Sequence, residues 1–372
     1  MTARERPRLL ILCPYPEGIA AGQRLKYEQY LDDWRAMGFD IDVSPFMDIS
    51  LWRVAFTRGA YLEKARGISH GYLRRLRDLF RIHRYDVVYV FMWVTPFGTS
   101  LFERLVRLLA KRLVFDVEDN VLAEQTQPNS NHPNPIIGLL RSREKVRHLV
   151  RTADHVVTSS PFLNEFCRTL NKKSCCTYIS SSVDVERFVP ANRYANDKPV
   201  VIGWTGTFSS KEYLDLLHNV FSKLASRVPY KLKVIGNFDY ALDGIDLEVV
   251  RWTKEREVQD LQDIDIGVYP LPINDWVLGK SGLKAIQYMA FGLPIVATDV
   301  GTTPLLITDN VNGLLVRTEE EWIAALEKLV HDPSLRKRLG EKARTDAVAN
   351  YSLPVIALQY RQVLQTTMGI AT

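Results

Sequence analysis

Short β-rich runs alternate with longer helical stretches along this 372-residue chain, and the alternation is the feature that most restricts its fold. The apolar run Leu9–Cys13 ends at a proline, and we expect a helix from Gln23 to Met37 to follow it and to end at Gly38. Successive β-rich runs are far enough apart for a crossover helix between them, which favours parallel strands covered on both faces. The further strands expected in this half are 41–43, 86–91, 112–116 and 155–158.

The alternation restarts after a polar, proline-bracketed stretch at 189–199, which is the best candidate for a linker. A chain of this length exceeds the size at which a single core usually keeps growing, so two domains are expected. We predict an α/β protein with a first domain at 1–190, a second at 191–350 and a final helical segment at 351–372. The strands expected in the second domain are 200–204, 231–236, 247–250, 264–269 and 294–297.

Composition indicates the cellular compartment of the protein and which kinds of binding site to expect. The chain is 46% hydrophobic, has four cysteines without metal-ligand spacing, and has no apolar stretch approaching a membrane span. We therefore expect a cytoplasmic protein without a metal site, and its dispersed basic residues do not predict nucleic-acid binding.

Charge is divided unevenly along the chain. Residues 1–190 hold 28 Lys and Arg against 21 Asp and Glu, although the net charge of the whole chain is only +5. A basic first half is suited to an anionic membrane surface or to a phosphate-bearing acceptor, and an ordinary mixed surface is the alternative.

Ligands of open parallel sheets bind beyond the carboxyl ends of the strands, so the loops there are the candidate sites. The loop after the first strand contains Gly18 and Gly22, which let backbone N–H groups approach an anion, and Arg24 follows in the next helix. A simple tight turn explains the same glycines equally well.

Three carboxylates cluster after the expected strand 112–116, at Asp116, Glu118 and Asp119. Such a cluster is costly unless it is solvated, paired or catalytic, so these residues are candidates for accepting hydrogen bonds from the hydroxyl groups of a ligand or for acting as a base. A helix N-cap cluster is the alternative interpretation.

The strongest pattern lies at 275–294, which begins like a loop and becomes helical. Gly279, Ser281 and Gly282 place backbone N–H groups at a helix start, and the lysines there favour a bound anion such as a diphosphate, because cations are normally disfavoured at that end. A solvated lysine face is the alternative. The binding residues predicted here are Lys280, Ser281, Gly282, Lys284 and Gln287.

A fourth loop, at 203–211, adds Gly206 and Lys211 to the candidate phosphate site. Its spacing does not match a Walker loop.

The segment Lys280–Gly292 resembles the donor-binding segment of GT-B glycosyltransferases, specifically glycosyltransferase family 4 of the bacterial surface-polysaccharide type. Residues 287–294, Gln-Tyr-Met-Ala-Phe-Gly-Leu-Pro, are similar to the family's Glu-Ala-Met-Ala-x-Gly-x-Pro sequence. Further similarity lies at 181–190, 299–304 and 310–316.

The resemblance implies two Rossmann-like domains facing a cleft, with the last helix returning to the first domain. The second domain is then expected to bind the nucleotide and the first to bind the acceptor, with the Gly18–Arg24 loop facing the cleft. It also implies a retaining, metal-independent transfer without a cofactor, in which a UDP- or GDP-linked sugar is the co-substrate.

Two positions depart from the family pattern. The family often has two glutamates eight positions apart, and Gly279 and Gln287 stand there in this chain. Gln287 still has an amide for the ribose, whereas Gly279 cannot replace a carboxylate. The usual Arg/Lys pair on the diphosphate is reduced to Lys211 with Lys280 or Lys284.

We therefore predict a glycosyltransferase, hexosyltransferase-like, that moves a sugar from a nucleotide-diphosphate sugar to a glycan or lipid-linked acceptor in cell-surface polysaccharide or glycoconjugate biosynthesis. Peripheral contact with the inner membrane through the basic first domain belongs to the same prediction. The alternatives are a nucleotide-sugar epimerase or hydrolase on the same fold, and a catalytically inactive sugar-nucleotide-binding protein.

Overall fold

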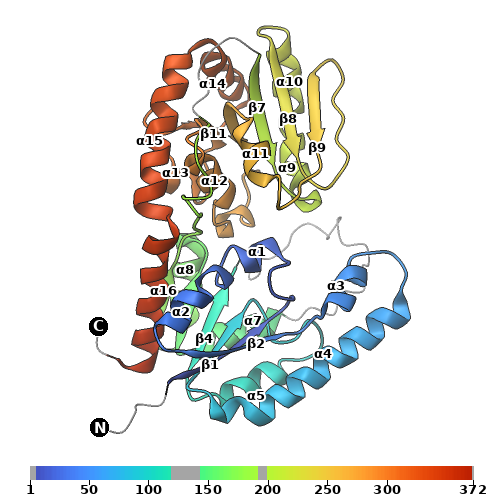
Figure 1. The fold of residues 1–372 in the computed structure, drawn as a ribbon, viewed down its shortest axis with the longest axis vertical. Helices are drawn as coiled ribbons and strands as arrows, with labels where there is room; N and C mark the ends of the chain where they lie inside the picture. The colour runs from blue at the N-terminus through green and yellow to red at the C-terminus, as the bar shows by residue number, and fades with distance from the viewer. Residues whose placement is uncertain (1–5, 119–142, 192–198, 371–372) are drawn as a thin grey trace. The chain divides into compact units, whose positions relative to one another are not determined.

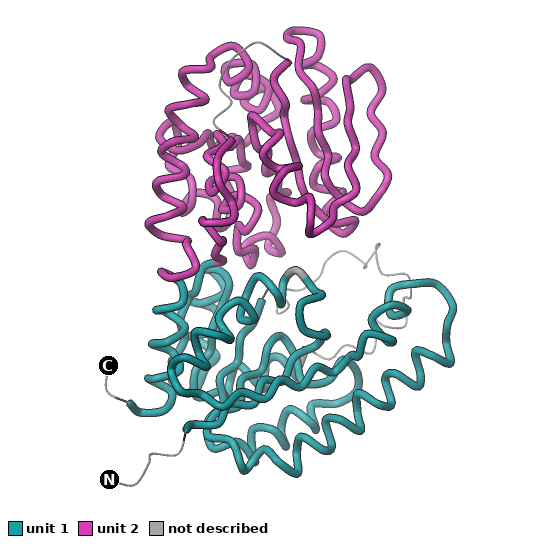
Figure 2. Tube along the Cα trace, in the orientation of Figure 1, with its two compact units in different colours: residues 1–180, 356–372 teal, residues 181–355 magenta. Residues whose placement is uncertain are grey.

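The computed structural model describes residues 6–118, 143–191 and 199–370, and it divides into two compact units (Figures 1 and 2). Unit 1 comprises residues 1–180 and 356–372, and unit 2 comprises residues 181–355. Each unit is built on one six-stranded parallel sheet with helices on its faces, so the predicted α/β class with two Rossmann-like domains is confirmed.

The sheet of unit 1 has the strand order β2-β1-β3-β4-β5-β6, with every neighbouring pair parallel. The order reverses between β1 and β3, which makes this the topological switch point of the sheet. The strands are β1 (Arg8–Cys13), β2 (Asp40–Pro45), β3 (Val87–Phe91), β4 (Leu113–Val117), β5 (His155–Thr158) and β6 (Cys176–Tyr178).

Apolar side chains on both faces of this sheet are buried under helices, as a parallel sheet requires. One core packs Leu10, Val88 and Phe115 of the sheet against Val106 and Leu149 of the helices. The described helices of unit 1 are α1 (Ala21–Arg24), α2 (Leu31–Ala36), α3 (Ile49–Ala55), α4 (Tyr61–Arg81), α5 (Leu101–Leu109), α7 (Arg143–Thr152), α8 (Pro161–Leu170) and most of α16 (Leu353–Met368).

The single helix predicted from Gln23 to Met37 is wrong. The chain forms α1, a 3₁₀ turn at Glu28–Tyr30 and then α2. Side-chain bonds hold the break: the Gln23 amide donates to the Tyr15 carbonyl at 2.8 Å and to Glu28 Oε1 at 2.6 Å. The predicted end at Gly38 is confirmed, since this glycine has a φ of 95° after α2.

The sheet of unit 2 has the order β12-β11-β10-β7-β8-β9 and is also parallel throughout. Its switch point lies between β7 and β10. The strands are β7 (Val200–Thr205), β8 (Tyr230–Ile235), β9 (Asp246–Val250), β10 (Ile266–Tyr269), β11 (Ile295–Thr298) and β12 (Leu314–Val316).

Two hydrophobic cores cover the two faces of this sheet. One contains Phe221 of α10 and Leu326 of α14, and the other contains Ile286 of α12 and Ala343 of α15. The helices of unit 2 are α9 (Lys211–Asp215), α10 (His218–Ala225), α11 (Glu257–Gln262), α12 (Leu283–Ala290), α13 (Thr303–Leu306), α14 (Glu319–His331) and α15 (Pro333–Tyr351).

The division between the units falls at Ser180 and Ser181, before the boundary predicted at residue 190. The residues just after it are held by unit 2, because Arg344 donates to the carbonyl oxygens of Val185 at 2.8 Å and Phe188 at 2.6 Å. The chain returns to unit 1 within α16, from Ile356 onward, where Tyr360 packs on Tyr30 with ring centroids 4.9 Å apart.

Candidate functional site

The candidate site of unit 2 lies at the switch point between β7 and β10. The loop after β7 (206–210), the loop after β10 (270–282) and the loop after β11 (299–302) begin at the same edge of the sheet. Thr302 Oγ1 donates to the Lys280 carbonyl at 2.5 Å, which ties the second of these loops to the third. The structure therefore brings the two loops predicted to bind phosphate, 203–211 and 275–294, to one edge of one sheet.

Gly282 sets the start of α12. It is the N-cap residue with a φ of 75°, and a Cβ added there would lie 2.3 Å from Leu306 Cδ1. Any other residue is therefore disfavoured both by backbone conformation and by space. The first backbone N–H groups of α12 have no acceptor within the helix, and the helix dipole places positive potential there.

Lys284 lies in the first turn of α12 and turns back toward the loop after β7. Its Nζ donates to Ser210 Oγ at 3.1 Å and lies 4.5 Å from the centroid of the Trp204 ring. Burial, and then the charge of Lys280, lower the pKa of Lys284 from 10.5 to about 7. No carboxylate of the described residues forms an ion pair with this ammonium group, so an anionic ligand is the group that would compensate its charge.

Lys280 stands beside this group, with its Nζ 5.6 Å from the centroid of the Trp276 ring. One helical turn after Lys284, Gln287 is buried, and its side-chain amide has no hydrogen-bond partner among the residues that the structure describes. Ser281 is half-buried between Lys280 and Gly282. The residues predicted to bind phosphate and ribose therefore lie around the start of one helix, α12.

Lys211 is placed differently from the other two lysines. Its Nζ is 3.0 Å from Asp215 Oδ2, one helical turn away on α9, and it lies over the Tyr240 ring at 5.3 Å. An internal carboxylate therefore already compensates its charge. Gly206 precedes it in the loop after β7, where an added Cβ would come within 2.2 Å of Trp204.

Sequence reasoning did not select Trp204, Ser210 and Thr302 as site residues, although each contacts one of the predicted lysines. Trp204 and Ser210 flank Gly206 in the loop after β7, so the only available signal was their position next to a predicted loop. Thr302 approaches from the loop after β11, which no local pattern connects to Lys280.

The loop after β1 in unit 1 is occupied by carboxylates. The Gly18 amide donates to Glu28 Oε2 at 2.9 Å, and a Cβ added at Gly22 would lie 3.1 Å from Glu118 Oε2. Burial raises the pKa of Glu28, while the Gly18 amide and the nearby Arg24 charge act in the opposite direction. The Gly18 amide expected to receive an anionic ligand thus has an acceptor from the protein itself.

The three carboxylates predicted after β4 have separate environments. Asp116 is fully buried, its Oδ1 lies 3.7 Å from Lys26 Nζ, and its Oδ2 accepts a 2.5 Å hydrogen bond from Tyr89. Glu118 is half-buried beside Gly22, and Asp119 lies outside the described residues. Asp116 therefore occupies a structural position in the core, and a catalytic role for any of the three stays a prediction.

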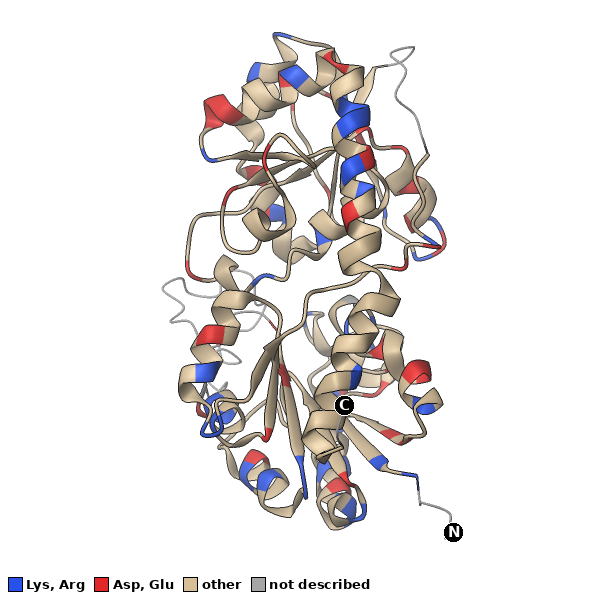
Figure 3. Ribbon diagram, turned by 90° about the vertical axis from the view of Figure 1, so that its left-hand side faces the viewer, with Lys and Arg blue, Asp and Glu red and all other residues tan. Residues whose placement is uncertain are grey.

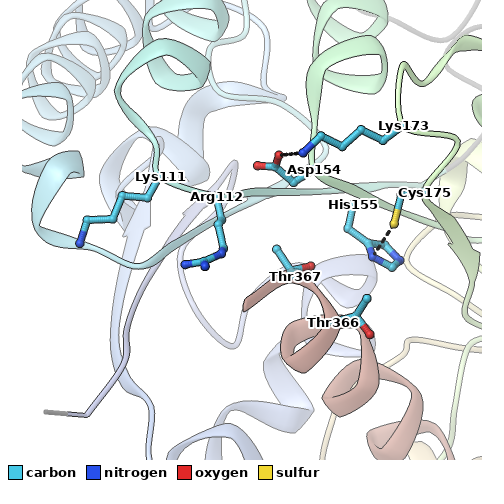
Figure 4. Close-up of a pocket in the computed structure, with 8 residues that line it drawn as sticks. All are labelled: Lys111, Arg112, Asp154, His155, Lys173, Cys175, Thr366 and Thr367. Carbon is cyan, nitrogen blue, oxygen red and sulfur yellow. Dashed lines mark hydrogen bonds and ion pairs between the residues drawn. The ribbon is translucent and has the colours of Figure 1, made fainter. Parts of the chain in front are cut away.

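A separate cavity of about 450 Å³ lies in unit 1, at the amino-terminal edge of β4 and β5 (Figure 4). Within it Lys173 is paired with Asp154 at 2.6 Å, and Cys175 Sγ lies 3.2 Å from His155 Nδ1. Burial lowers the pKa of His155 to about 4. Because it opens at the edge opposite the strand-end loops, this cavity is distinct from the candidate sites.

Metal ligands are not gathered anywhere in residues 6–118, 143–191 and 199–370: no group of three or more His, Cys, Asp or Glu side chains there is suited to hold an ion.

Comparison with known proteins connects unit 2 to one family. Residues 199–332 match the family described as glycosyl transferases group 1. D-inositol 3-phosphate glycosyltransferase of Saccharomonospora viridis is 30% identical over 198 residues, which are 45% of this chain and 45% of that protein. An uncharacterized glycosyltransferase of Haemophilus influenzae is 27% identical over 58% of this chain and 62% of its own length. The chain thus spans less than half the length of the first of these curated relatives.

Solved structures match nearly the whole chain. Sucrose-phosphate synthase of Thermosynechococcus elongatus has a TM-score of 0.69 at 17% identity and covers 98% of this chain and 100% of its own. HepE of Anabaena, in complex with UDP and glucose, has a TM-score of 0.65 at 14% identity, with 97% and 100% covered. These matches confirm the GT-B fold and the predicted resemblance to GT-B glycosyltransferases.

Proposed function

Starting from a chain of GT-B glycosyltransferase fold whose residues 199–332 match glycosyl transferases group 1, we propose that this protein transfers a sugar from a nucleotide-diphosphate sugar, UDP- or GDP-linked, to an acceptor. The observation that carries the proposal is the pair of lysines at the start of α12, where Lys284 has no carboxylate partner among the described residues. A pyrophosphate group supplies the counter-charge that Lys284 lacks among the described residues.

In the proposed site the pyrophosphate lies against the first N–H groups of α12. Lys284 and Lys280 neutralise the negative charge that grows on the nucleotide as the bond to the sugar breaks. Because these groups are fixed by the fold before the ligand arrives, little reorganisation opposes the reaction.

A bound pyrophosphate also stabilises the charged form of Lys284. Its ammonium form is disfavoured in the free protein, and an adjacent anion favours it. Gln287, buried one turn further along α12, is the proposed partner of the ribose hydroxyl groups.

We assign the acceptor to unit 1, with Glu118 and the Gly18–Arg24 loop as the candidate contacts. A glycan or lipid-linked acceptor at the cytoplasmic face of a membrane, in the synthesis of cell-surface polysaccharide or glycoconjugate, agrees with the basic first half of the chain. A relative is named for D-inositol 3-phosphate, which makes a phosphate-bearing polyol a further acceptor to include. The proposed reaction transfers a hexose, retains the configuration of its anomeric carbon and needs no metal ion.

The test is incubation of the purified protein with radiolabelled UDP- and GDP-sugars, with and without a panel of glycan, lipid-linked and inositol phosphate acceptors, in buffer with EDTA. Label transferred to an acceptor supports the proposal, and the anomeric configuration of the product tests retention. Conversion of donor at the same rate without any acceptor identifies an epimerase or hydrolase instead. Tight nucleotide binding without any conversion identifies an inactive binding protein.

A further inference from the structure

A row of apolar side chains is exposed along the outer face of α4. Leu62 is 85% exposed and Phe80 is 80% exposed, and Leu73 and Leu76 between them are exposed as well. Positions 73, 76 and 80 follow helical spacing, and position 62 lies on the same face three turns before Leu73. Single exposed leucines are ordinary, whereas several on one helix face, here with Arg66 and Ser69 between Leu62 and Leu73, are typical of an interaction surface.

The opposite face of α4 is fixed against the rest of unit 1. Gly71 lies so close to Phe46 that an added Cβ would come within 2.6 Å of its ring. The buried Arg75 donates to the carbonyl oxygens of Cys13 at 2.8 Å and Val94 at 2.8 Å. The helix cannot rotate to bury its outer row without breaking these contacts.

Helix α5 extends the same surface. It packs beside α4, where the Tyr72 and Phe102 rings meet edge to face with centroids 5.6 Å apart (Figure 1). Its outer side exposes Leu101 and Leu108, and Leu108 is 78% exposed. We call the outer sides of these two helices the α4–α5 face; its apolar members are Leu62, Leu73, Leu76, Phe80, Leu101 and Leu108.

Arginines accompany the apolar row. Arg66 and Arg77 on α4 and Arg84 just after it are exposed, and none of the three forms a hydrogen bond or ion pair within the part of the chain that the structure describes. Figure 3 shows Lys and Arg on the helices of unit 1.

Acidic groups on the two helices do not neutralise this charge. Asp78 is buried in ion pairs with Arg75 at 3.0 Å and Arg81 at 3.0 Å, and Glu103 is buried 3.8 Å from Lys145. Glu63 is the one exposed acid on α4.

From this combination we infer that the α4–α5 face docks unit 1 onto a membrane surface that contains anionic lipids. Leucine and phenylalanine side chains enter the boundary between headgroups and acyl chains, while the arginines stay at the level of the phosphates, as in amphipathic helices that lie flat on a bilayer. None of the described helices is long and apolar enough to cross a membrane.

The charge on this face disfavours a second copy of the chain as its occupant. A two-fold interface would bring the same patch of both copies together, and this patch carries more unpaired arginines than exposed acids. Like charges across an interface are unfavourable, whereas an anionic surface offers each arginine a counter-charge. An acidic protein is the remaining alternative, and the experiment below separates it.

The test is flotation of the purified chain with vesicles of phosphatidylcholine alone or with 30 mol% phosphatidylglycerol (about a third, a content that gives a strongly negative surface). We expect at least about tenfold more bound protein on the anionic vesicles, and binding that weakens as salt is raised. Equal binding to both vesicles, or none to either, would overturn the inference.

Two variants locate the surface. Leu73→Ser combined with Phe80→Ser removes two exposed apolar side chains, and Arg66→Gln combined with Arg77→Gln removes two unpaired charges. Both are expected to reduce vesicle binding about tenfold or more while far-UV circular dichroism and the Tm stay unchanged, since the changed side chains are exposed.

The matched control is Leu358→Ser with Val348→Ser, which removes exposed apolar side chains from α16 and α15. It is expected to bind vesicles like the unchanged chain. Equal loss in control and test variants contradicts the assignment, as does sedimentation of the unchanged chain as a dimer that Leu73→Ser with Phe80→Ser dissociates.

This inference assigns a defined surface, the α4–α5 face, to the membrane contact that the sequence predicted. Its test does not depend on the proposed function, because the vesicles contain no sugar donor and no acceptor. Nucleotide affinity is measured on the same variants. If vesicle binding is lost while nucleotide affinity is kept, docking and donor binding are separate properties. If the chain binds vesicles and no nucleotide, the docking inference stands and the proposed function fails.

Discussion

The two units share one sheet design and differ in the charges at its functional edge. Each sheet reverses its strand order beside its first strand, and each places a glycine-containing loop there. In unit 2 that edge holds Lys280 and Lys284, with Lys284 lacking a carboxylate partner among the described residues. In unit 1 the corresponding loop is bonded to Glu28 and lies beside Glu118.

This difference shows that the fold alone does not select the anion-binding unit. Backbone N–H groups and a helix start are present at both edges. In unit 1, however, the Gly18 amide already donates a hydrogen bond to the carboxylate of Glu28. An anion is therefore expected to prefer unit 2.

The largest expected effect is on stability, from Asp116→Asn in unit 1. This change leaves Lys26 buried without its charged partner, which typically costs about 3–5 kcal/mol of unfolding free energy. Urea unfolding measures the loss, and nucleotide affinity is expected to stay unchanged under native conditions. If Asp116→Asn instead abolishes sugar transfer at full stability, Asp116 is catalytic, and its assignment as a structural residue of unit 1 is wrong.

The next largest effect is on binding, from Lys284→Met in unit 2. Loss of this ammonium group is expected to weaken nucleotide-diphosphate affinity by about tenfold or more, measured by calorimetry. Lys337→Met, an exposed lysine of α15 in the same unit, is the control and should leave affinity unchanged. Unchanged affinity in Lys284→Met removes this residue from the phosphate site.

The pH dependence of binding sharpens the same point. In the free protein Lys284 has a pKa of about 7, and a bound pyrophosphate favours its charged form, so binding takes up a proton above that pH. Affinity for a nucleotide sugar is expected to be flat below about pH 7 and to fall by up to about tenfold per pH unit above it. The slope should be absent in Lys284→Met, and a slope that persists there must come from another group.

A smaller effect is expected from Lys211→Met. This lysine is already paired with Asp215, and exposed pairs of this kind contribute about 0–1 kcal/mol, so nucleotide affinity should change by less than about fivefold. The same calorimetric titration measures it. A loss equal to that of Lys284→Met would show that Lys211 leaves Asp215 for the ligand.

The smallest effect is on the unliganded protein, which Lys284→Met should stabilise. The lowered pKa means that the unfolded chain binds this proton more tightly than the folded one, so the ammonium group costs stability below about pH 7 and this cost fades as pH rises toward 10.5. A rise in Tm of about 2–4 °C is expected at pH 6, with a smaller rise at pH 9. A fall in Tm at pH 6 would mean that the contacts with Ser210 and Trp204 outweigh the buried charge.

Much of the fold was predictable because a parallel sheet buries both faces of each strand. Strands such as those at Leu9–Cys13 and His155–Thr158 can therefore be recognised from their apolar runs without tertiary information. The strand β6 (Cys176–Tyr178) was missed, since it is a three-residue edge strand that is only half-buried. The helix predicted at 23–37 failed because side-chain bonds from Gln23 and Glu28, invisible to periodicity, break it.

The candidate site was predictable in part for a similar reason. Gly282 and Lys284 are neighbours in sequence, so their placement at one helix start follows from local pattern. The contacts of Lys284 with Ser210 and Trp204, and that of Thr302 with Lys280, join loops far apart in the chain, and only packing of the sheet brings them together.

The sequence by itself determined the two alternating βα units and the lysine-bearing helix start, because strand burial and helix termini are local properties of the chain. Only the tertiary structure decided that Asp116 is already paired with Lys26 and that the Gly18 amide already has Glu28 as its acceptor. The physical reason is that the pairing of a charge depends on distances of a few ångströms between side chains, which a residue pattern does not fix.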